Sequence, residues 1–145
     1  MKLIKNNFNK GFTLIELLVV IAIIGILSSI VLASLNTARD KGGNAAVKGN
    51  LQGIRSQAEV VYDNNGLSYA NVCSDPNIMS AIDAAIIAGV DTGASVATRC
   101  NSQAADWAVN VLLKTPEGAN NYWCVDSTGA GKGEPSELAG AFVCA

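Results

Sequence analysis

The sequence G-F-T-L-I-E at residues 11–16, with the apolar run that follows it, decides the fold of this chain. Between Lys10 and Arg39 the only formal charge is that of Glu16. A helix of about 24 residues is roughly 36 Å long at 1.5 Å per residue, more than the hydrocarbon thickness of a bilayer, about 30 Å. In lipid a helix is favoured because it satisfies its own backbone hydrogen-bonding groups. The run therefore predicts a membrane-spanning helix over residues 12–35.

Glu16 is the exception within this apolar run. A carboxylate carried into a membrane costs on the order of 2.5–3.5 kcal/mol on insertion scales. Such a residue therefore usually has a compensating partner or a functional role. One interpretation is an interfacial residue whose side chain reaches back to the headgroups. The other is a functional carboxylate that finds a cation inside an assembly of helices.

The segment from Lys10 to Leu35 resembles the N-terminus of the type IV pilin and pseudopilin family. Members of that family begin with a short basic leader that ends in glycine, followed by F-T-L-I-E and a long apolar helix. The resemblance implies that a dedicated prepilin peptidase cleaves between Gly11 and Phe12 on the cytoplasmic face. It also implies that the new amino group of Phe12 is N-methylated.

The same resemblance gives Glu16 an expected role in assembly. Glu16 is expected to pair with the positive amino terminus of Phe12 on a neighbouring subunit, and Thr13 to add a hydrogen bond to that contact. An unpaired carboxylate in lipid is costly, whereas one that faces an ammonium group is not, so subunits would assemble in one axial register.

The implied function is that of a structural subunit of a type IV pilus-like extracellular filament, a homo-oligomer with helical symmetry. The implied partners are the prepilin peptidase, an inner-membrane assembly platform with its ATPase, and membrane lipid before assembly. Two alternatives stay open within the family: a pseudopilin of a type II secretion system, and a minor pilin involved in adhesion or DNA uptake. A third is a membrane-anchored surface binding protein that never polymerises.

Basic residues determine the expected topology. Lys2, Lys5 and Lys10 precede the apolar run, so by the positive-inside rule the N-terminus stays cytoplasmic and the body is exported. An ordinary secretory signal would have a shorter apolar region, of about 7–15 residues, with the cleavage site after it. We therefore expect a single-pass prepilin that later becomes part of a filament on the cell surface.

Three segments follow from these observations. Residues 1–11 are the expected leader peptide, and residues 12–35 the expected transmembrane and polymerisation helix. Residues 36–145 are the expected periplasmic or extracellular globular domain, which includes the C-terminal half of the long helix. A chain of 145 residues has room for one modest domain beside such a helix.

Composition argues against several classes of function. Three of the ten basic residues lie in the leader, so the rest of the chain has seven basic and twelve acidic residues, a formal charge of −5. A nucleic-acid-binding body would instead need a basic face. The sequence contains no histidine, the commonest acid–base catalyst and metal ligand. We expect no enzyme activity, no catalytic residue, no cofactor and no metal site.

The four cysteines, Cys73, Cys100, Cys124 and Cys144, all follow the apolar run. They form no C-x-x-C pair of the zinc or thioredoxin type. An even number in an exported domain predicts two disulfides, for which three connectivities exist. We expect the sequential pairing, Cys73–Cys100 and Cys124–Cys144, because each pair closes one local loop.

After the apolar run the periodicity changes to that of an amphipathic helix. Apolar residues recur at steps of three and four to residue 61, at Val47, Leu51, Ile54, Ala58 and Val61. The two patterns together predict one long helix over residues 12–63. Ser74 or Asp75 is positioned to cap a second helix that begins at Pro76 and ends at Gly89.

The C-terminal half predicts a small sheet. A loop is expected over residues 89–105, strands over 107–113, 122–125 and 141–144, and turns over 116–121 and 128–133. The expected fold class is α+β. In the pilin fold that the N-terminus implies, the long helix packs on a small antiparallel β-sheet, with two disulfides.

Two weaker motifs in the C-terminal half do not predict a binding site. The glycine-rich residues 128–133 lack the spacing and the following helix of a phosphate-binding loop. Asp126 and Glu134 are too few carboxylates for a calcium site. Trp107, Tyr122 and Trp123 are expected to be core and sheet residues.

Overall fold

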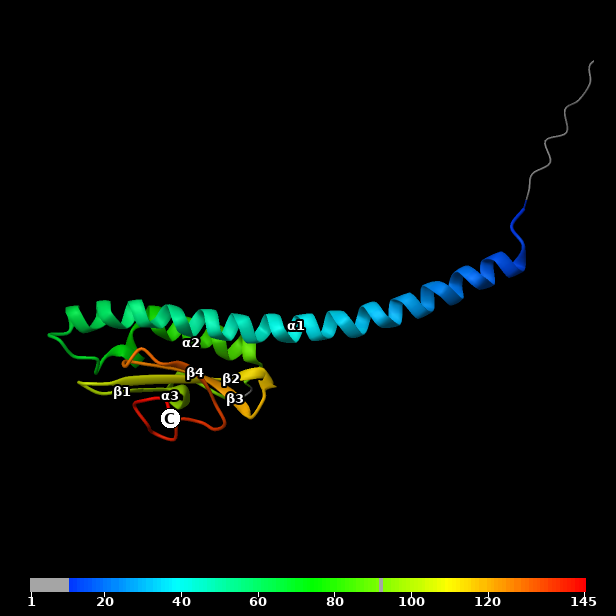
Figure 1. Ribbon diagram of the computed structural model, residues 1–145. Coiled ribbons are helices and arrows are strands. Elements are labelled where there is room, and N and C mark those ends of the chain that lie inside the picture. Colours follow the sequence, from blue (N-terminus) through cyan, green and yellow to red (C-terminus); the bar gives the residue numbers. More distant parts are fainter. Residues whose placement is uncertain (1–10, 92) are drawn as a thin grey trace, which may run out of the picture. The chain divides into compact units, whose positions relative to one another are not determined.

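The computed structural model describes residues 11–91 and 93–145, which divide into two compact units at Thr37–Ala38 (Figure 1). We refer to the described residues before this boundary as the N-terminal unit and to residues 38–145 as the C-terminal unit. Residues 1–10 of the expected leader, including its three lysines, lie outside the described residues.

Helix α1 (Leu14–Asn64) contains both periodic patterns found in the sequence. None of residues 11–39 is buried within the chain. From Asn44 onwards one face of α1 becomes buried, and its buried residues are Asn44, Val47, Leu51, Ile54 and Ala58. The predicted apolar stripe is thus the face that packs on the globular body, with Val61 partly buried at its end.

Asn44 is the polar member of this face. Its side-chain amide donates to the backbone oxygen of Thr115 at 2.8 Å, and its Oδ1 accepts from the backbone N–H of Thr115 at 3.1 Å. A second link lies one turn further on, where the Lys48 ammonium is 2.6 Å from the Glu117 carboxylate and 4.5 Å from the ring centroid of Trp123. Burial of Asn44 is tolerated because its hydrogen bonds are made.

Helix α2 (Pro76–Gly89) forms as its sequence predicts, after a short 3₁₀ turn η1 (Val72–Ser74). Asp75 is the N-cap and its carboxylate accepts from the backbone N–H groups of Asn77 and Ile78 at 3.0 and 3.1 Å. Proline fits the first helical position because its missing N–H would have no intrahelical partner there.

The sheet has four antiparallel strands in the order β1-β2-β3-β4. These are β1 (Cys100–Ser102), β2 (Trp107–Glu117), β3 (Asn120–Asp126) and β4 (Gly131–Glu134). One face of β2 is buried in the hydrophobic core with α1 and α2, through Trp107, Val109, Val111 and Leu113. Figure 1 shows α2 beside the second half of α1, with the sheet packed against them. The α+β pilin fold with two disulfides is confirmed.

Several element predictions in the C-terminal half are wrong. Residues 89–105 were expected to be a loop but contain helix α3 (Val96–Arg99) and strand β1. The turn between β2 and β3 is limited to Gly118 and Ala119, because both strands extend beyond their apolar cores. Pro116 falls where the β2–β3 register shifts, a position that tolerates the loss of a backbone donor.

The last strand is also placed differently. Residues 141–144 form no strand. Residues 131–133, expected to end a turn, instead form β4 beside β3 together with Glu134. Glycine is required within β4 because a Cβ on Gly133 would lie 2.6 Å from Nδ2 of Asn120. Strand β4 therefore forms through pairing and close approach, which its polar sequence does not reveal.

Two disulfides join segments of the C-terminal unit. Cys73 is bonded to Cys100 and Cys124 to Cys144, with Cα–Cα distances of 5.7 and 5.9 Å. These are the sequential pairs. The first attaches the segment before α2 to β1, and the second attaches the C-terminal segment to the sheet.

Candidate functional site

The N-terminus of α1 is built as a capping box, in which Thr13 is the N-cap residue. The Thr13 hydroxyl accepts from the backbone N–H of Glu16 at 3.2 Å. In return, Oε2 of Glu16 accepts from the backbone N–H and the hydroxyl of Thr13, each at 2.7 Å. The Thr13 carbonyl accepts the first backbone bond of the helix, from Leu17. The helix start is thus satisfied by residues of the same chain.

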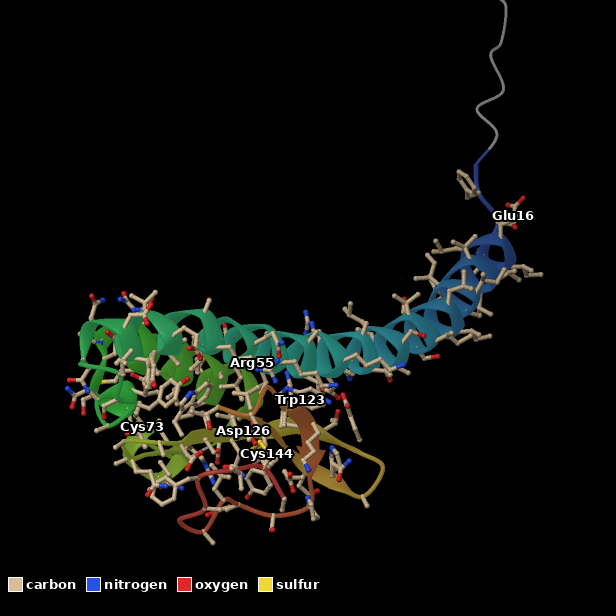
Figure 2. All side chains as sticks on the ribbon, turned by 60° about the vertical axis from the view of Figure 1, so that its left-hand side comes forward. Glu16, Arg55, Cys73, Trp123, Asp126 and Cys144 are labelled. Carbon is tan, nitrogen blue, oxygen red and sulfur yellow. A yellow bond between two sulfur atoms is a disulfide. The ribbon has the colours of Figure 1, made fainter. Side chains whose placement is uncertain are left out.

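This arrangement gives Glu16 a partner that sequence reasoning missed. Thr13 was expected to contribute to a contact between subunits, whereas here it binds the Glu16 of its own chain. The signal was present as T-x-x-E directly before an apolar run, the signature of a capping box. Figure 2 shows Glu16 at the very start of α1. The pairing of Glu16 with Phe12 of a second copy stays a prediction.

The apolar surface behind Glu16 is the other part of the site. Phe12 is 91% exposed, and exposed large apolar side chains continue around the helix to Leu35. Helix α1 is also the one helix among the described residues that is long and apolar enough to cross a membrane. A helix that is apolar all round must be covered, by lipid or by other helices. Gly11 and Phe12, the expected cleavage site, are exposed just before this helix.

The two carboxylates considered for calcium both lie near the Cys124–Cys144 disulfide. Glu134 lies opposite Tyr122 in the β3–β4 pair, whereas Asp126 lies beyond the other end of that pair, after Val125. Both oxygens of Asp126 accept hydrogen bonds from residues 128, 130 and 144. A carboxylate oxygen of Glu134 lies near the sulfurs of Cys124 and Cys144. Those two sulfurs are bonded to each other in a disulfide and are therefore not free thiolate ligands.

The aromatic residues lie in or beside the sheet. Trp107 is 1% exposed and belongs to the core, while Tyr122 and Trp123 are half-buried. Trp123 lies between α1 and β3, as Figure 2 shows. Tyr122 lies on the opposite face, where its hydroxyl donates to Glu137 at 3.2 Å and its ring lies 5.2 Å from the Arg99 guanidinium. These contacts give the aromatic side chains a place in packing.

Comparison with known proteins points to one family. Residues 6–32 match the prokaryotic N-terminal methylation motif. The chain is 28% identical to the type IV major alpha-pilin of Moraxella bovis, over 87% of this chain and 91% of that one. It is 29% identical to the type IV major pilin protein PilE of Neisseria gonorrhoeae, over 82% of this chain and 75% of the relative.

A third relative, the fimbrial protein of Neisseria meningitidis serogroup A, is 29% identical over 82% of this chain and 74% of its own length. No solved structure gives a significant match. These relatives are structural pilins, which is consistent with a chain that is not an enzyme. The matched methylation motif, the relatives named above and the long apolar helix on an antiparallel sheet together support a type IV pilin family for this chain.

Proposed function

We propose that this chain is the structural subunit of a type IV pilus-like extracellular filament and polymerises through residues 12–35. The observation that carries this proposal is the exposed, apolar first half of α1, with Glu16 as its one charged residue before Arg39. The names of the three relatives, two major pilins and a fimbrial protein, support the same function.

The physical basis of polymerisation is an exchange of environments. In the membrane the apolar side chains of residues 12–35 are covered by lipid, and in the filament by the same segment of other copies. Little apolar burial is lost in this exchange, since lipid tails are about as apolar as leucine side chains. Selection of the register must therefore come from polar groups, of which Glu16 is the charged one.

Cleavage between Gly11 and Phe12 creates the cation that Glu16 requires. The new N-terminal amine lies four residues before Glu16, at the end of the helix that enters the assembly. In the precursor, the Thr13 N–H and hydroxyl already solvate Oε2 of Glu16. In the filament, the carboxylate gains the ammonium group of a neighbouring Phe12, a charge-assisted contact that is stronger than a neutral hydrogen bond.

The remaining parts of the proposal concern segments and location. Residues 1–11 serve as the leader, removed by a prepilin peptidase that also methylates Phe12, and residues 36–145 form the exported domain. The precursor is a single-pass membrane protein with its N-terminus in the cytoplasm. A membrane assembly platform and its ATPase, which the family resemblance implies, supply the energy for extrusion.

The first test of this function is the N-terminus of the protein in its native host. Filaments sheared from cells should yield a chain that begins at an N-methylated Phe12, as measured by mass spectrometry of the intact protein and of its N-terminal peptide. Filaments should be missing from micrographs of cells without the gene and return when it is restored. An intact Met1 in assembled material would contradict the proposal.

A further inference from the structure

The C-terminal end of α2 carries an exposed apolar patch that the fold does not use. Ile87 is 77% exposed and Val90 57% exposed. Together with Ile86 they line a shallow depression of about 260 Å³. Asp91, the other lining residue, turns away into an ion pair in which its Oδ2 lies 2.7 Å from Nε of Arg99. We call Ile86, Ile87 and Val90 the α2 patch.

The backbone at Val90 is strained for the residue that occupies it. Val90 is the C-cap of α2, with φ 58° and ψ 39° in the left-handed region. Glycine or asparagine is the usual residue there, and a β-branched side chain is an outlier. The exposed side chain of Val90 adds no packing to the core that would offset this backbone strain. A strained, exposed valine is therefore evidence that its side chain has a use outside this chain.

The α2 patch lies at the end of the C-terminal unit where α1 enters it. Helix α2 runs antiparallel to α1: Asp75 at its start lies 3.4 Å from Nε2 of Gln57, and Gly89 at its end lies against Val47. The Ala88 carbonyl, next to the patch, would be 3.1 Å from a Cβ on Gly43. In the sequence Gly43 comes only eight residues after the apolar run ends at Leu35.

Basic residues lie at the same end of the unit, on α1 and on β2. Arg39 and Lys41 are exposed on α1, just before Gly43. The acidic residue between them, Asp40, is 3.7 Å from the Lys114 ammonium. The side chain of Lys114 in turn lies against Gly43. Apolar side chains and basic residues thus occur together where the chain leaves the predicted membrane span.

We propose that the α2 patch, with Arg39 and Lys41, docks on the anionic lipid surface of the membrane in which residues 12–35 are anchored. This inference rests on the proposed function, in which the precursor is anchored in the membrane. It adds that the C-terminal unit of the precursor binds the lipid surface before assembly. Apolar side chains that enter the interface beside lysine and arginine are the recognised chemistry of peripheral lipid binding.

Lipid fits this surface better than a second copy of the chain does. Three side chains offer far less area than the roughly 800 Å² per partner of a stable protein interface. A weak contact suffices for lipid, because the apolar helix tethers the body to the membrane at high effective concentration. The adjacent cations add electrostatic attraction to anionic headgroups near the surface.

The test uses the full chain in vesicles and a tryptophan probe. Ile87→Trp places the probe in the α2 patch, and Leu67→Trp is the matched control. Leu67 is 66% exposed and has φ 64°, and it follows the C-terminal end of α1, at the opposite end of the unit. The emission of each variant, less that of wild type, is measured in vesicles of phosphatidylethanolamine and phosphatidylglycerol, with and without shallow brominated acyl chains.

We expect bromine to quench the tryptophan at position 87 and not the one at position 67. Quenching at position 87 should fall when phosphatidylglycerol is replaced by neutral lipid or when salt is added. Equal quenching at both positions overturns the inference. A position-87 signal that changes with the protein-to-lipid ratio but not with bromination would show a second copy on the patch, which also overturns it.

A second pair of substitutions separates lipid docking from folding. In the Ile87→Trp background, Val90→Gly should relieve strain and keep the thermal midpoint, yet lower the ratio of docked to undocked chains roughly tenfold. Leu67→Gly relieves comparable strain and should leave docking unchanged. Docking that survives Val90→Gly contradicts the inference.

Failure of the inference can be distinguished from failure of the proposed function. Flotation of the vesicles shows whether the chain is inserted at all. A chain that does not float with them overturns the membrane stage of the proposed function, and this inference with it. A chain that floats, with no quenching at position 87, overturns this inference alone.

Discussion

Asp126 accepts four hydrogen bonds, three from the turn before β4 and one from the C-terminal segment. Its Oδ1 accepts from the hydroxyl and the backbone N–H of Thr128 at 2.7 and 2.9 Å and from the N–H of Ala130 at 3.1 Å. Its Oδ2 accepts from the N–H of Cys144 at 2.8 Å. Figure 2 shows Asp126 beside Cys144. One carboxylate therefore fixes both the turn before β4 and the disulfide-bonded end of the chain.

The pH dependence of this contact follows from its hydrogen bonds. Burial by itself would raise the pKa of Asp126, but the bonds from Thr128, Cys144 and Ala130 outweigh burial and lower the pKa below its ordinary value of 3.8. A lowered pKa in the folded state means that the ionised form stabilises the fold above the unfolded pKa. This stabilisation is lost as the pH falls through the folded pKa, which places the loss below about pH 4.

We predict that Asp126→Asn lowers the free energy of unfolding at neutral pH by about 1–3 kcal/mol, because the amide cannot accept all four bonds. The difference between wild type and variant should shrink as the pH falls below about 4. Chemical denaturation of the full chain in detergent, at a series of pH values, measures both effects. Asp63→Asn, at an exposed position, is the control and should change little. A difference that stays constant down to the lowest pH would contradict this role.

At the scale of elements, close packing between α2 and β2 depends on one glycine. A Cβ on Gly89 would lie 2.0 Å from the backbone oxygen of Leu112, a contact that only movement of a helix or a strand can relieve. Gly49, in the exposed middle of α1, has no atom within 4 Å of the same position. The two glycines therefore differ in what an added methyl group meets.

This difference predicts opposite effects of the same substitution. Gly89→Ala should lower the free energy of unfolding by about 1–3 kcal/mol or more, as overpacking does. Gly49→Ala should raise it by about 0.5–1 kcal/mol, because alanine is the better helix former at an exposed position. Thermal and chemical denaturation of both variants are the measurements. Similar stability changes of the same sign would show that α2 is not packed as described.

Elements built from local signals could be predicted from the sequence, and elements built by pairing could not. The apolar stripe on α1 and the Asp75–Pro76 start of α2 depend on residues a few positions apart, so the sequence predicts both. Strand β4 forms because β3 offers it a partner and Gly133 leaves room for Asn120. Nothing in its polar sequence indicates either condition.

In the candidate site too, features set by neighbouring residues could be predicted and contacts between distant residues could not. Glu16 is recognisable as a site residue because a single carboxylate in an apolar run is costly. The two disulfides are predictable because the number of cysteines is even and all of them follow the apolar run. The T-x-x-E pattern before an apolar run predicts the capping role of Thr13, whereas the family resemblance points only to a contact with another subunit. The bonds of Asp126 to Cys144 join distant parts of the chain and could not be inferred from spacing.

At the scale of the whole molecule, the two parts of the chain differ in whether they bury their own apolar side chains. The C-terminal unit buries its own apolar face in a core and closes its loops with two disulfides. The first half of α1 buries none of its side chains within the chain. A helix that is apolar all round must be covered by lipid or by other helices, and the proposed function assigns it lipid first and other copies later.

The most direct test of that claim compares wild type with Glu16→Ala and Glu16→Gln in a strain with no other pilin. Glutamine keeps the side-chain acceptor of the capping box, since either Glu or Gln serves there, but removes the charge. If Glu16 recruits the amino terminus of the next subunit, both variants leave a buried ammonium unpaired, at a cost of about 3–5 kcal/mol.

The measurement is the yield of sheared filaments relative to the pool of processed chain in the membrane. We predict that both variants are cleaved between Gly11 and Phe12 and accumulate in the membrane as wild type does, while filament yield falls sharply or to zero. Wild-type filament yield from Glu16→Ala would contradict the pairing mechanism and, with it, the account of how this chain assembles.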